Sequence, residues 1–318
     1  MSDIEPFFPP ELEQAIFERA AESAPESIPV LLLVCLRVYH WIEPMRFRTI
    51  TASGIRSTLP GLALLCYDDD LPQDFPSRLA EALSPAAYHK PKSPDFLHRH
   101  VRNLCTDEIN ISALLLSLGT GVTNLYFNGS WRQLPVAPPI LPLLFALKLR
   151  RLSMPLQILV DNLSSPGHPK FFSTITHFQA LDRGVPSAKA THWPSFLAAH
   201  FPALTHVSFT SETVSFSRAY EVREGMQNLY TEVLRRCTIL QVLVHFVVIG
   251  LDTMELPVSA FPDVDDVRAV LMIGEGCLEA DWVKDVRGST DVWTRAETVI
   301  EKRRLDLSRI RNHPYSVC

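Results

Sequence analysis

Leu204-Thr205-His206-Val207-Ser208-Phe209 is the clearest copy of a short phrase that recurs through the middle of the chain. The phrase places two polar or small residues between two apolar ones and leads into a run of β-prone residues. Its other copies begin at Val101, Val122, Leu149, Ile175, Leu240 and Val267, at intervals of 21 to 36 residues. Stretches of helical character lie between copies, at residues 111–118, 140–147, 196–201 and 226–236. The pattern predicts one strand per copy and a helical connection between most copies.

Strands and helices that alternate at such intervals resemble leucine-rich-repeat-like solenoids, in which each unit buries its apolar face against its neighbours. The resemblance is to degenerate repeats, because the Asn that usually turns the loop after the strand is mostly absent, with Asn128 as one exception. The expected fold class is therefore mixed α/β, with an irregular leucine-rich-repeat-like solenoid over residues 99–275. An ordinary α/β domain with a parallel sheet is the alternative.

Alternation along a strand assigns each repeat residue to one face of the sheet. The residues expected to point into the core are Leu104, Leu125, Leu152, Phe178, Val207 and Leu243. Their neighbours then form an exposed strip, which solenoids commonly use for binding. The candidate client-binding residues on this strip are Asn124, Tyr126, Arg151, His177, Gln179 and His206. Tyr126 and Arg151 are the preferred anchors, since both residue types are enriched at binding hot spots. The alternatives for this strip are that it is merely solvated or that the C-terminal helix covers it.

The first fifty residues predict two helices. Phe8-Pro9-Pro10-Glu11-Leu12 opens the first, with prolines suited to a helix entry, and Pro25 ends it. The second is expected over residues 28–39, where the pattern is apolar almost all round, so we expect burial on most of its faces. Glu43-Pro44 is expected to break that run.

This segment resembles the F-box, the helical module that docks substrate receptors onto the adaptor of a cullin–RING ubiquitin ligase. The resemblance covers about residues 7–50 and rests on Phe8-Pro9-Pro10-Glu11-Leu12, Ile16-Phe17, Val34-Cys35 and Trp41. The residue pattern of this segment is similar to that of the F-box-like families of fungi. It implies an F-box-like module over residues 1–52, with Pro10, Leu12, Ile16 and Trp41 as adaptor-binding candidates. The alternative is a helical cap that only closes the end of the following domain.

Two further segments complete the predicted organisation. Residues 53–98 form a connecting segment with a short helix at 76–83. Residues 276–318 form a C-terminal helix and basic tail, whose apolar side is Trp282, Val286, Trp293, Ala296, Val299 and Ile300. The basic run Lys302-Arg303-Arg304 suits a helix C-terminus, and a nuclear-import signal is the alternative.

Composition narrows the function. The 318 residues carry a net charge of −5, so no basic field favours nucleic acid. The six cysteines have no close metal-ligand spacing and fit a reducing cytoplasm or nucleus. The acidic start lacks a signal-peptide core, and the apolar runs are too short to cross a bilayer. Neither a Gly-x-Ser-x-Gly elbow nor a phosphate loop is present, so we expect no cofactor and no catalysis.

The sequence thus predicts a non-catalytic substrate-receptor subunit of an SCF-type ubiquitin ligase, which binds an unknown client protein through the repeat region. A free-standing interaction scaffold is the second interpretation. A divergent α/β enzyme is a third, weaker one.

Overall fold

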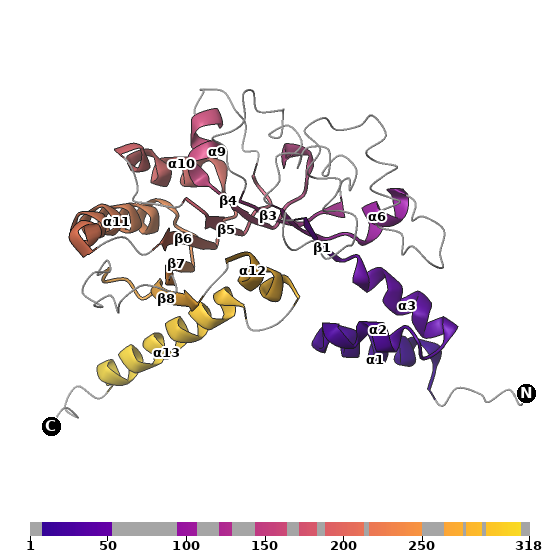
Figure 1. Cartoon of the computed structure of the whole chain (residues 1–318). Helices are drawn as coiled ribbons and strands as arrows, with labels where there is room; N and C mark the ends of the chain where they lie inside the picture. Colours follow the sequence, from indigo (N-terminus) through magenta and orange to yellow (C-terminus); the bar gives the residue numbers. More distant parts are fainter. Residues whose placement is uncertain are drawn as a thin grey trace, which may run out of the picture.

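The computed structural model describes residues 8–52, 94–106, 121–128, 144–163, 172–182, 188–212, 216–249, 264–275, 278–287 and 291–312. Within these ranges the protein is mixed α/β, with one open sheet of eight parallel strands in chain order, β1 to β8 (Figure 1). The strands are β1 (Thr49–Ala52), β2 (Asn103–Thr106), β3 (Asn124–Phe127), β4 (Arg151–Met154), β5 (His177–Ala180), β6 (His206–Glu212), β7 (Val242–Ile249) and β8 (Ala269–Glu275).

The predicted strand register is confirmed. The six residues expected in the core pair across neighbouring strands as Leu104, Leu125, Leu152, Phe178, Val207 and Leu243. All six are buried, as is Ile50, which pairs with Leu104 at the edge of the sheet. Because alternate residues of a strand face opposite sides, this ladder fixes the side chains on the other face as well.

Helices cover both faces of the sheet (Figure 1). On one side lie α9 (Leu156–Leu163), α10 (Trp193–His200) and α11 (Phe216–Arg236), whose apolar side chains share one core cluster with the ladder. The helix expected at 226–236 falls within α11, and the one expected at 196–201 overlaps α10, which ends at His200. A helical turn at 144–146 lies within the stretch expected at 140–147. The helices expected at 76–83 and 111–118 lie outside the described residues. On the other side lie α12 (Leu278–Val286) and α13 (Val292–Asn312).

The N-terminal segment differs from its prediction. It forms α1 (Pro10–Ser23), the 3-10 turn η1 (Pro25–Ser27), α2 (Ile28–Leu31) and α3 (Leu36–Arg46), so the single helix expected over 28–39 is wrong. Cys35 is extended, with φ −165° and ψ 166°, and this residue separates α2 from α3. The expected break at Glu43-Pro44 is also wrong, since Pro44 lies inside α3.

These helices enclose a small core of their own. Ala21 of α1 packs with Val38 and Ile42 of α3, and Glu13 pairs with Arg37 across the two helices. The expected burial of the second helix is wrong, because Leu33 is 85% exposed and Leu36 is 73% exposed. The side chains that made the sequence look like a buried helix therefore largely face solvent.

Candidate functional site

The parallel sheet brings the six predicted client-binding residues together on one face. Asn124, Arg151, His177 and His206 occupy the same position on β3 to β6 and are paired in register. Tyr126 and Gln179 lie two residues further along their strands, in a second row with Ser153 and Ser208. The sequence therefore located this face correctly.

The expectation that this face is exposed is wrong at Tyr126, Gln179 and His206, which are all buried. Tyr126 is 2% exposed. Its ring lies 5.7 Å from that of Trp282 in α12, and Cys105 and Leu181 complete the cluster. The strand register is not the cause, since Leu125 beside it is also buried. The C-terminal segment lies over this part of the strip, since Trp282 of α12 packs against Tyr126 and Cys105.

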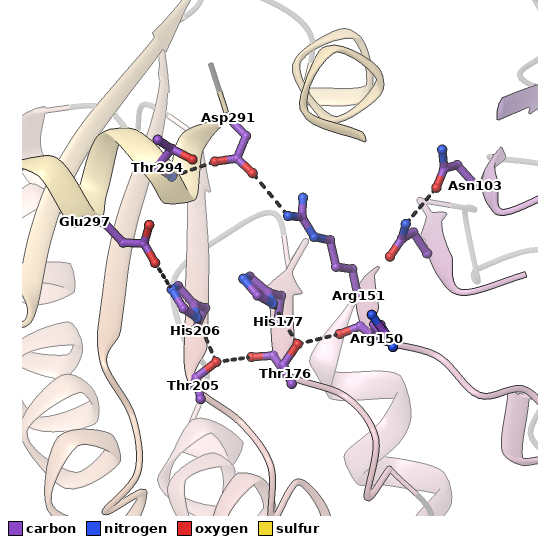
Figure 2. A network of polar contacts seen from close by, with 11 residues as sticks. Asn103, Arg150, Arg151, Thr176, His177, Thr205, His206, Asp291, Thr294 and Glu297 are labelled. Carbon is purple, nitrogen blue, oxygen red and sulfur yellow. Dashed lines mark hydrogen bonds and ion pairs between the residues drawn. The ribbon is translucent and has the colours of Figure 1, made fainter. Parts of the chain in front are cut away.

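Helix α13 covers the other end of the same face. Trp293, Ala296 and Ile300 pack against Val242 and Val244 of β7. Val299, expected on the same apolar side, is exposed. Glu297 bonds His206 at 3.0 Å (Figure 2). Gln179 and His206 are both buried. Arg151 and Asn124, nearer the middle of the sheet, remain half-buried.

Two histidines form the centre of the covered face. His177 and His206 stack with ring centroids 4.2 Å apart, and Trp293 meets both rings edge-on at 5.4 and 5.6 Å. Each imidazole has its Nδ1 atom 2.8 Å from the hydroxyl of the threonine before it, Thr176 or Thr205 (Figure 2). The Thr-His pair is thus a repeated structural unit as well as a repeated sequence.

Burial and mutual proximity keep these histidines neutral at pH 7. Desolvation, then the charges of His206 and Arg151, lower the pKa of His177 to about 3. Desolvation also lowers the pKa of His206, although the Glu297 carboxylate opposes that shift. The pair is therefore a hydrogen-bonded packing element at neutral pH.

Asp291 joins the sheet to α13. One carboxylate oxygen accepts the backbone N–H of Thr294 at 2.6 Å, which caps the helix, and the other accepts Arg151 at 3.2 Å (Figure 2). Nearby Asp285 has its pKa raised to about 7, by burial first and by the Asp291 charge second. The Asp291 carboxylate is thus paired with the Arg151 guanidinium. The ionised form of Asp285, in contrast, is destabilised by burial and by the charge of Asp291.

An open cleft of about 780 Å³ begins where the helices stop covering the sheet. Its lining comes from the amino ends of β2 to β5, from α6 (Pro94–His100), and from the ends of α3, α12 and α13. Five arginines line it: Arg48, Arg99, Arg102, Arg150 and Arg151. Asn103, Asn124, Thr123 and Thr176 add amides and hydroxyls, while Asp285 and Asp291 are the acidic members. The cleft is therefore a concentration of hydrogen-bond donors with positive charge in excess.

Sequence reasoning missed most of this cleft. Arg102 and Arg150 each occupy the second position of a repeat phrase, immediately before β2 and β4. This repeated placement could have predicted from the sequence that the two arginines lie along the same edge of the sheet. The contribution of Arg99 from α6 was not readable, since it depends on how the chain between β1 and β2 returns to the sheet.

The adaptor-binding candidates lie apart from the cleft, on α1 and α3. Pro10, Leu12 and Ile16 are exposed on α1, and the last two are one helical turn apart. Trp41 is half-buried, with the guanidinium carbon of Arg37 5.4 Å from its ring centroid. The structure thus places three of these side chains in solvent and one at the edge of the small core.

Within the described ranges, no group of three His, Cys, Asp or Glu side chains is arranged to hold a metal ion. None of the helices in that part of the chain combines the length and apolarity needed to cross a membrane. No family model, curated protein or solved structure matches this chain.

Proposed function

We propose that the protein is a non-catalytic substrate-receptor subunit of an SCF-type cullin–RING ubiquitin ligase. In this proposal α1 to α3 form the F-box-like module that docks on the ligase adaptor. The region from β2 to β8 acts as an irregular leucine-rich-repeat-like solenoid that binds a client protein. The F-box resemblance of residues 7–50 supplies the identity of the partner.

The observation that carries the proposal is the concentration of exposed apolar side chains at the N-terminus. Of the eleven large hydrophobic residues exposed in the described ranges, seven lie between residues 8 and 36: Phe8, Leu12, Ile16, Val30, Leu33, Val34 and Leu36. Isolated exposed apolar residues are ordinary, but a concentration of them marks an interaction surface. A segment that only capped the sheet would direct these side chains toward the sheet and not into solvent.

The helices also have what a separate docking module needs. Their own core of Ala21, Val38 and Ile42 lets them hold their shape while other apolar side chains face outward. Two ion pairs add to this, Glu13 with Arg37 and Glu22 with Arg48, the second at 3.1 Å. Exposed pairs of this kind contribute little stability, so the apolar contacts carry most of it.

For the client-binding part, the supporting observation is the repetition of one backbone contact. The N–H of the first residue of each strand from β2 to β7 bonds the carbonyl of the residue just before the preceding strand, as Asn103 bonds Arg48 and His206 bonds Thr176. Strands that follow one another in this way, in chain order, expose one continuous edge at their amino ends. The arginine-lined cleft lies on that edge and is the open surface where a client would bind.

The test is capture of the purified ligase adaptor by the full-length protein. Leu12→Asp should abolish capture, because it places a charge where an apolar side chain would be buried. Leu305→Asp is the matched control, since Leu305 on α13 has the same exposed fraction, 54%. Both variants should keep the melting temperature of the parent protein. Failure of the unmutated protein to capture the adaptor would refute the ligase assignment.

A further inference from the structure

The five arginines of the cleft are poorly balanced by acidic side chains. The whole chain has 30 basic and 35 acidic residues, yet the described residues that line the cleft include five arginines and two aspartates. One of these aspartates, Asp291, already pairs with Arg151. The local excess of positive charge therefore runs against the charge of the molecule as a whole.

Three of these arginines stand in a column along the amino edge of the sheet. Arg48, Arg102 and Arg150 each precede a strand directly, at β1, β2 and β4, and Thr123 fills the same place before β3. Backbone hydrogen bonds link the successive positions, so neighbours in the column are about 4.8 Å apart. Like charges on adjacent strands are unfavourable, so this arrangement costs stability unless an anion offsets it.

The arginines differ in how far they are already engaged. Arg48 pairs with Glu22, and Arg102 donates to the carbonyls of Val101 and Gly121 at 3.2 Å. Arg99 and Arg150 are exposed, and neither guanidinium has a partner in the part of the chain that the structure describes. These two side chains come from different elements, α6 and the segment before β4, yet line the same cleft.

Neutral polar groups surround the arginines. The hydroxyls of Thr123 and Thr176 lie on either side of Arg150 in the column and donate to the carbonyls of Arg102 and Arg150. On the floor, an amide chain runs from Asn124 to Asn103 at 2.7 Å and from Asn103 to Thr49 at 2.9 Å. The guanidinium groups, which carry N–H donors and no acceptor, match the acceptor-only oxygens of a phosphate group.

We infer that this cleft binds a ligand that carries phosphate groups, with Arg99, Arg102 and Arg150 as the principal contacts. Phosphate fits better than a single carboxylate, because the donors are spread over three strands and a helix and exceed what one carboxylate accepts. The cleft volume of about 780 Å³ is in the range of small-molecule sites and leaves room for more than one phosphate group. A phosphorylated side chain of a client and a free phosphorylated small molecule share this chemistry. The inference concerns the cleft alone and does not depend on adaptor docking.

The test is calorimetric titration of the full-length protein with sodium pyrophosphate at pH 7.5 and low salt. Saturable binding at one site is expected, and it should weaken steeply as sodium chloride is raised. Arg99→Ala combined with Arg150→Ala should lower the affinity at least tenfold without changing the melting temperature, since neither guanidinium has a partner among the described residues. Arg304→Ala is the matched control, because Arg304 is exposed on α13 and lies outside the cleft lining, and it should bind as the parent does.

Two further probes separate the sources of the ligand. A doubly phosphorylated serine peptide that binds more tightly than pyrophosphate would indicate a phosphoprotein, and tighter binding of inositol hexakisphosphate would indicate a small molecule. Either result supports the inference, provided that the double variant loses it. Absence of pyrophosphate binding up to millimolar concentration, or equal binding by the double variant, would overturn the inference and leave adaptor capture untouched.

Discussion

The imidazole rings of His177 on β5 and His206 on β6 stack with their planes inclined by 10° and their centroids 4.2 Å apart. The two positions are paired in the register of the sheet, so the stack follows from the repeat itself. Two imidazolium cations at this distance would repel one another in a half-buried site. The stack therefore ties the packing of α13 on the sheet to the neutral form of both side chains.

The first prediction is that acid destabilises the protein through this pair. With a folded pKa of about 3 and an unfolded pKa of about 6.5, His177 takes up its proton mainly on unfolding, so its contribution is complete above pH 6.5 and is lost as pH falls toward 3. The loss should reach roughly 2 kcal/mol at pH 5 from His177 alone. Glu297, Asp291 and Arg151 are the other charged groups that face the pair.

Thermal denaturation between pH 7.5 and pH 5 checks this prediction. Over that interval the buried histidines lower the melting temperature, while protonation of Asp285, whose pKa is raised to about 7, acts in the opposite direction. The melting temperature of His177→Gln should therefore fall less than that of the parent, at the cost of some stability at pH 7.5. His245, also buried with its pKa lowered to about 4, will leave a residual slope in the variant. An identical slope in parent and variant would show that the pair does not control acid stability.

The second prediction concerns the cover over Tyr126. Trp282→Ala should lower the free energy of unfolding by about 3–5 kcal/mol, because it removes a buried indole and leaves a cavity against Tyr126 and Cys105. Urea denaturation measures the change. Leu33→Ala is the control, since Leu33 is 85% exposed and its loss should cost within about 0.5 kcal/mol. Equal costs for the two variants would mean that α12 does not pack on the sheet.

The third prediction separates the two roles of Asp291. Asp291→Asn keeps an acceptor for the N–H of Thr294 but removes the charge that engages Arg151. It should change stability little and strengthen pyrophosphate binding several-fold, because Arg151 is released toward the cleft. Asp291→Ala loses the cap as well, and should cost about 1 kcal/mol more. Weaker pyrophosphate binding by Asp291→Asn would show that the carboxylate holds Arg151 in a binding geometry.

The fourth prediction concerns Asp285. Its folded pKa of about 7 lies above its unfolded value, so its ionisation opposes folding, and stability falls as pH rises from about 4 to 7. Asp285→Asn should therefore raise the free energy of unfolding by roughly 1–3 kcal/mol at pH 8 and leave it nearly unchanged at pH 4. Denaturation at the two pH values checks the difference. A gain of equal size at both would assign the effect to packing and not to charge.

The repeat phrase determined strands β2 to β8, whereas β1 (Thr49–Ala52) lies before its first copy and was not predicted. The register and the buried ladder from Leu104 to Leu243 follow from apolar spacing along the chain, because a period of two assigns alternate residues to opposite faces. Placement of Asn124, Arg151, His177 and His206 in one row follows from the same phrase, since equivalent repeat positions become neighbours in a parallel sheet.

Tertiary structure alone decided what happens to that row. Apolar spacing shows that α12 and α13 each have a side to bury, but it does not say against which surface. The structure seats Trp282 on Tyr126 and Trp293 on the histidine pair, and so covers the strip that the strand pattern left open. The same limit applies at the N-terminus, where an apolar run reads as buried whether its partner is the same chain or another one. Local periodicity identifies the apolar surfaces that must be buried. Contacts between segments that are distant in the sequence decide which segment packs on each of those surfaces.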